Sequence, residues 1–179
     1  MKQVFTTLSL VLLLAFTDNS NFLDKITAYQ KDSYFKQKVY NEKDWRGFYS
    51  LPEANQKVDP KNYDLHLLNA ALFYATNKYR EERGASALKF SAGLRNAAVI
   101  HSNEMVTKGF YDHFNSKEKK LYSPDDRMKL FIADPGYSGE TCDDNFVYTN
   151  TQETYIQIAE KIIDNLDSSP HHKAILMEK

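Results

Sequence analysis

Apolar residues recur every three or four positions in three stretches of the chain, which is the spacing of residues on one face of an α-helix. The first stretch begins after Asp64, which is suited to cap a helix, and stops at Gly84, which is suited to end one. The second runs between Ser91 and Gly109, and the third starts near Thr151. The recurring positions are Leu68, Leu72, Ala75 and Tyr79, then Leu94, Ala97, Ala98, His101 and Met105, then Ile156, Ala159, Ile163 and Leu166. The pattern therefore predicts three amphipathic helices.

Proline and glycine positions divide the rest of the C-terminal half. Ser169 stands directly before Pro170, an arrangement typical of a helix start, so a last helix carrying His172 is predicted. Residues 110–150 sustain no helical period and contain several prolines and glycines. We therefore expect loops there, with one short helix near Asp125 to Phe131.

The N-terminus has the pattern of a targeting segment. Lys2 precedes an apolar run from Val4 to Phe16, which is as long as the apolar region of a signal peptide. A membrane-spanning helix needs about 20 apolar residues, so the run is too short for one. We predict a signal peptide over residues 1–19, export to the cell envelope or beyond, and no membrane span once it is removed. A buried N-terminal helix is the alternative.

Residues 20–62 are polar and rich in tyrosine and lysine. They could form an extended lead that docks its aromatic side chains on the main domain, or a partly ordered linker, and the pattern leaves both open. We place the main domain at residues 63–179.

The composition and net charge of the chain exclude some classes of function. The formal net charge of the 179-residue chain is −1, which argues against a nucleic-acid partner. Cys142 is the only cysteine, which excludes an intramolecular disulfide and a zinc site with several cysteines. Aromatic residues are abundant, with 12 tyrosines and 11 phenylalanines. The chain has the composition of an ordinary globular domain.

Four polar residues are candidates for a site. His101 lies in an apolar helix stripe, where a packed histidine bonded to backbone is the common case. His113 is flanked by aromatic residues, and Glu140 follows a glycine that allows close approach of a partner. His172 lies near a helix N-terminus, where the helix dipole favours the neutral imidazole that binds metals. Each signal is weak by itself, and no catalytic residue is assigned.

The order of these residues resembles the CAP superfamily, or SCP domain, named after cysteine-rich secretory proteins, antigen 5 and pathogenesis-related 1 proteins. The matching segments are Asn77, Arg80, Gly84 and Leu88 (N-x-x-R, Gly, Leu); Gly109 to His113 (G-F-x-x-H); Asp126-Arg127 (D-R); Gly139-Glu140-Thr141 (G-E-N); and Ser169 to Leu176 (S-P-x-H-R-x-N-I-L). Thr141 departs from the asparagine of the family pattern. The last segment resembles the bacterial members of the family.

The resemblance implies an α/β fold, an α-β-α sandwich of CAP/SCP type. The strands that normally follow the last helix in this family are missing from this chain, so the sandwich would expose apolar helix faces. The resemblance also implies a cleft lined by His113, Glu140 and His172. Two imidazoles and a carboxylate would suit zinc or a similar divalent metal.

Two functions follow from this resemblance. The first is an exported binding module whose cleft holds a lipid, peptide or glycan. The second is a metal-assisted hydrolase, protease-like, that uses the same cleft. The sequence has neither a zinc-binding H-E-x-x-H helix nor a nucleophile elbow, so we predict binding rather than catalysis.

Overall fold

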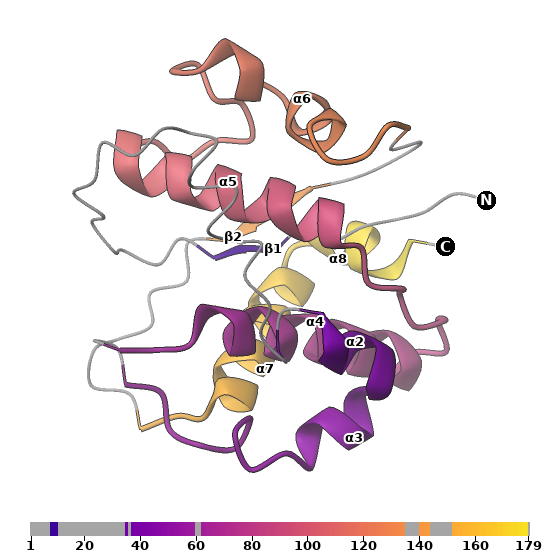
Figure 1. Cartoon of the computed structure of the whole chain (residues 1–179). Coiled ribbons are helices and arrows are strands. Elements are labelled where there is room, and N and C mark those ends of the chain that lie inside the picture. The colour runs from indigo at the N-terminus through magenta and orange to yellow at the C-terminus, as the bar shows by residue number, and fades with distance from the viewer. Residues whose placement is uncertain are drawn as a thin grey trace. The chain divides into compact units, whose positions relative to one another are not determined.

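The computed structural model in Figure 1 describes residues 8–10, 35, 37–59, 62–134, 140–143 and 152–178. They divide into two compact units. Unit 1 comprises residues 1–31 and 91–145, and unit 2 comprises residues 32–90 and 146–179. Each unit is therefore built from segments that are distant in the sequence.

Unit 2 is built of helices. Its elements are α2 (Lys38–Glu42), α3 (Trp45–Tyr49), α4 (Leu65–Glu82), α7 (Tyr155–Ser168) and α8 (Pro170–Met177). Helix α7 packs on α4, and α8 follows α7 after a short break (Figure 1). The apolar residues of α4 and α7 that the pattern identified are buried in this unit. The packing of these two helices on each other supplies its core.

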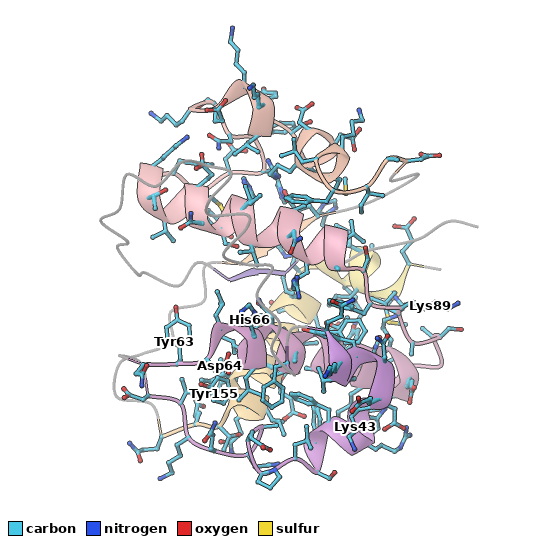
Figure 2. The ribbon with its side chains drawn as sticks, viewed as in Figure 1. Lys43, Tyr63, Asp64, His66, Lys89 and Tyr155 are labelled. Atoms are coloured by element: carbon cyan, nitrogen blue, oxygen red, sulfur yellow. The ribbon has the colours of Figure 1, made fainter. Side chains whose placement is uncertain are left out.

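The start of α4 is anchored by the residue predicted to cap it. The side chain of Asp64 accepts hydrogen bonds from the backbone N–H groups of His66 and Leu67, at 2.8 and 3.1 Å. The backbone N–H of Asp64 donates to the hydroxyl of Tyr155, at 2.7 Å, and Figure 2 labels these residues. Because Tyr155 is the first residue of α7, this contact fixes the start of one helix against the start of the other.

Aromatic side chains from α2 and α3 pack on α4. The ring of Tyr40 stacks on that of Phe90 with centroids 3.6 Å apart, and the ring of Phe48 stacks on that of Tyr74 at 4.5 Å. The hydroxyl of Tyr74 also donates a hydrogen bond to the carbonyl of Val39. Residues 37–59 thus dock aromatic side chains, as one alternative for the tyrosine-rich lead expected, but they do so from helices rather than from an extended chain.

Unit 1 is organised around α5 (Ala92–Lys108) and α6 (Pro124–Lys129), with the short 3-10 helix η2 (Lys119–Leu121) between them. A small core joins α5 to the end of α6. Its residues are Leu94, Ala97, Met128, Phe131 and Ile132.

The contact between α5 and the end of α6 depends on a glycine. A Cβ atom added to Gly93 would lie 2.6 Å from Cγ1 of Ile132 and 3.2 Å from the carbonyl oxygen of Phe131. Since real Cβ atoms do not approach other atoms so closely, the absence of a side chain at Gly93 sets how near these two segments come.

The prediction of an α-β-α sandwich is wrong. The strands in the described residues are β1 (Leu8–Leu10) and β2 (Thr141–Asp143), which pair in parallel with Leu8 opposite Thr141. Two strands of three residues cannot form the middle layer of a sandwich. The apolar faces of α4 and α7 are instead buried against each other, so this pair of helices does not need a sheet to cover them.

The predicted signal peptide, residues 1–19, lies outside the described residues except for the backbone of Leu8–Leu10. It stays a prediction. Among the described helices, none combines the length and the apolar character required to cross a membrane.

Candidate functional site

His101 supports the loop that carries His113. Its side chain is fully buried in α5, and its Nε2 atom lies 2.8 Å from the carbonyl oxygen of Asp112. Gly109 ends α5 in the left-handed conformation, with φ of 63°, which turns the chain back toward the helix. The interpretation of His101 as a packed residue bonded to backbone is confirmed.

The environment of His101 determines its protonation. A carbonyl oxygen only accepts hydrogen bonds, so Nε2 carries the proton that Asp112 receives. Burial lowers the pKa of His101 below its ordinary value, and this outweighs the opposing attraction of Glu140, whose Oε2 lies 3.9 Å from Nε2. Nδ1 is buried without a hydrogen-bond partner in the described residues. The imidazole is therefore neutral near pH 7.

His113 and Glu140 meet directly in unit 1. Nδ1 of His113 lies 2.9 Å from Oε2 of Glu140. The Glu140 side chain is only 6% exposed, whereas the His113 side chain is 39% exposed. The pair thus presents a reachable imidazole in front of a nearly buried carboxylate. Two of the three residues predicted to form the site lie together.

Arg127 neutralises Glu140 from the other side. Its Nη2 atom lies 2.7 and 2.8 Å from the two carboxylate oxygens, and its side chain is 1% exposed. A buried carboxylate needs such a partner, because removing an unpaired charge from water costs several kcal/mol. Charge-assisted hydrogen bonds to both oxygens also fix the orientation of the carboxylate.

Arg127 also organises the backbone around the site. Its Nη1 atom donates to the carbonyls of Leu121 and Tyr122, at 2.9 and 3.2 Å, and Nη2 donates to the carbonyl of His113, at 3.0 Å. This role of Arg127 was not predicted from the sequence, although Asp126-Arg127 matches a motif of the family. The available signal was the position of that motif in a short helix, whose capping residue Ser123 precedes it by three positions.

The third predicted site residue, His172, belongs to unit 2. It lies in the first turns of α8, with its ring 6.0 Å from that of His171. It is thus not among the residues that unit 1 brings together, and its part in a site stays a prediction.

Arg127 competes with zinc or a similar ion for the Glu140 carboxylate in unit 1. Both oxygens of Glu140 already accept hydrogen bonds from Arg127, whose positive charge would repel a metal cation bound there. Within the stretches that the structure describes, no group of three or more His, Cys, Asp or Glu side chains could hold a metal ion. The zinc assignment to His113, Glu140 and His172 stays a prediction, with the first two in this unit.

Comparison with known protein families gives a match. The profile of the Cysteine-rich secretory protein family, CAP, matches residues 73–178, more than half of the chain. The chain belongs to the CAP family. Searches of curated proteins and of solved structures found no match.

The CAP motif at Asn77 and Arg80 has a structural role in unit 2. The side chain of Asn77 accepts from the N–H of Leu88 at 2.7 Å and donates to its carbonyl at 3.2 Å. Arg80 donates through Nε to the carbonyl of Ser86, at 2.9 Å, and through Nη1 to the carbonyl of Leu176. This part of the CAP pattern therefore holds the segment after α4 and the end of α8 in place.

Proposed function

We propose that this CAP-family chain is an exported binding protein, and that the His113–Glu140 pair contacts its ligand, a lipid, peptide or glycan. The observation that carries this proposal is the difference in exposure within the pair. Solvent reaches the imidazole, and the carboxylate behind it is held in a fixed orientation by a buried guanidinium. A pre-oriented, reachable hydrogen-bonding group supports ligand recognition, because little ordering cost remains to be paid on binding.

Binding is favoured over hydrolysis by the state of Glu140. Its two oxygens accept hydrogen bonds from Arg127, and Oε2 also contacts His113. A carboxylate engaged in this way suits the orientation of a neighbouring imidazole better than the activation of a water molecule. We therefore do not propose the metal-assisted hydrolase as the function.

Export is the second part of the proposal. It is supported by the lysine followed by an apolar run within residues 1–19. An exported protein that relies on no disulfide is also consistent with the single cysteine of the chain.

The test is native mass spectrometry of the protein purified from its own cell envelope or medium. We expect a retained ligand whose mass identifies its class, and a polypeptide mass shortened by the predicted signal peptide. His113→Asn and Glu140→Gln should lose the ligand. His171→Asn, a change at an exposed histidine of unit 2, is the control and should keep it.

Two results would contradict the proposal. One is a wild-type protein that carries no ligand, and the other is a ligand that both site variants retain. Because the Glu140 side chain is 6% exposed, its variant can lose stability. His113→Asn is therefore the variant on which the interpretation depends, since the His113 side chain is 39% exposed.

A further inference from the structure

Two exposed aromatic rings lie together in unit 1. Phe114 is 49% exposed and Tyr122 is 47% exposed, and their ring centroids are 5.3 Å apart with 37° between the ring planes. By contrast, the stacked rings of Phe48 and Tyr74 in unit 2 are buried. Paired aromatic side chains that remain half in water are a typical feature of a binding surface.

The aromatic pair belongs to the segment that carries His113. Phe114 follows His113 directly, and the carbonyl of Tyr122 accepts hydrogen bonds from Arg127 and from the backbone N–H of Asn115. The Asn115 side chain is fully buried and bonded to Glu104 of α5. The backbone that carries the two rings is therefore fixed by hydrogen bonds to Arg127 and, through Asn115, to α5.

The segment between the two rings is basic. It contains three exposed lysines, Lys117, Lys119 and Lys120, and a single acidic residue, Glu118. The Glu118 carboxylate accepts a hydrogen bond from the backbone N–H of Lys120 at the start of η2. This gives the loop a local positive excess in a chain whose net charge is −1.

We propose that the Phe114–Tyr122 surface binds an acidic polysaccharide, a chain of sugar rings with carboxylate or sulfate groups. The C–H face of a sugar ring can stack on an aromatic ring, its hydroxyls can bond to a polar pair such as His113–Glu140, and its acidic groups can pair with the lysines. This inference rests on the proposed function and names the ligand class. Single-stranded nucleic acid would use a similar combination of rings and cations, so it is the alternative that the experiment must distinguish.

The experiment is electrophoresis of the full, exported protein in native gels that contain polygalacturonate, with neutral dextran as the comparison polymer. We expect retardation by polygalacturonate alone. Because a stacked ring contributes roughly 1 kcal/mol, Phe114→Ala and Tyr122→Ala should each raise the Kd about fivefold. Replacing the three lysines with glutamine should raise the Kd and weaken its dependence on salt.

Matched controls separate this surface from general effects. Leu130→Ala removes a similarly exposed apolar side chain of unit 1, and Lys89→Gln removes an exposed lysine of unit 2. Both variants should bind polygalacturonate as the wild type does. Thermal unfolding of each variant verifies that it folds, and the lysine variant keeps the test valid if an aromatic variant does not fold.

Three outcomes would overturn the inference. They are equal retardation by dextran, retardation that the aromatic and lysine changes leave intact, and no retardation at all. Preferential binding to phosphatidylglycerol vesicles or to single-stranded DNA, lost in the same variants, would assign the surface to a membrane or to nucleic acid instead.

The two proposals can fail separately. If the purified protein retains a ligand at His113 but polygalacturonate does not bind, the inference fails and the proposed function stands. If polygalacturonate binding requires Phe114 and Tyr122 but is unchanged in His113→Asn, the aromatic surface binds by itself and the proposed role of the His113–Glu140 pair fails.

Discussion

Two buried arginines, one in each unit, have different kinds of partner. Arg80 of α4 is 3% exposed and Arg127 of α6 is 1% exposed. Arg80 donates to the carbonyls of Ser86 and Leu176, and it forms no ion pair with the residues that the structure describes. Burial lowers the pKa of its guanidinium. Arg127 donates to three carbonyls and also pairs with the carboxylate of Glu140.

The difference teaches that burial and residue type do not by themselves identify a site. Both arginines hold backbone segments together, and both match segments of the CAP pattern. Only Arg127 holds an acidic group next to a reachable imidazole. The partner of each arginine therefore separates Arg80, which holds backbone segments, from Arg127, which also positions the candidate site, and substitutions at the two positions should separate them in solution.

Arg127→Met should have the largest effect. It leaves the Glu140 carboxylate buried without its guanidinium, which typically costs about 3–5 kcal/mol. We expect the free energy of unfolding to fall by that amount in urea titrations that follow unit 1. The double variant Arg127→Met/Glu140→Gln should recover part of the loss, since no charge is then left unpaired. A double variant as unstable as Arg127→Met would show that the ion pair does not determine the effect.

Arg80→Met should have a smaller effect on stability. The change removes two hydrogen bonds, to the carbonyls of Ser86 and Leu176, but leaves no charge unpaired, whereas Arg127→Met leaves a buried carboxylate. We expect a decrease in the free energy of unfolding that is smaller than that of Arg127→Met, measured by urea titration. Glu140→Gln should give no recovery when combined with Arg80→Met. Recovery would contradict the distinction drawn between the two arginines.

His101 should give the smallest effect, visible as a pH dependence. The pKa of His101 is lowered in the folded chain, whereas an unfolded histidine takes up a proton near its ordinary value of 6.5. The unfolded state therefore binds more protons as the pH falls below that value, and the free energy of unfolding decreases. His101→Gln should flatten this decrease between about pH 6.5 and 5, and His171→Gln, an exposed control, should not. An unchanged slope in His101→Gln would refute the burial argument.

The helices followed from local sequence signals, and the site did not. Asp64, Ser91 and Thr154 accept hydrogen bonds at helix starts, and the short helix near Asp125 is present. Such contacts join residues a few positions apart, so the pattern can reveal them. His113 and Glu140 are 27 positions apart, and only the family resemblance paired them.

The role of Arg127 and the fold class were not predicted correctly, because both depend on partners that are distant in the sequence. The positioning role of Arg127 was missed because it depends on Glu140, a partner 13 positions away, and on backbone carbonyls that no sequence pattern marks. The sandwich was expected from the resemblance alone. The apolar stripes of α4 and α7 fit a helix partner as well as a sheet, so their spacing could not have decided the fold class.

Gly93 affects the position of Arg127 without contacting it. Its missing side chain lets the segment after α6 approach α5 closely, and α6 carries Arg127. Any larger residue at this position would displace that segment and, with it, the guanidinium that orients Glu140. A substitution at this one apolar contact would therefore change the orientation of the His113–Glu140 pair while leaving every polar residue of the candidate site as it is.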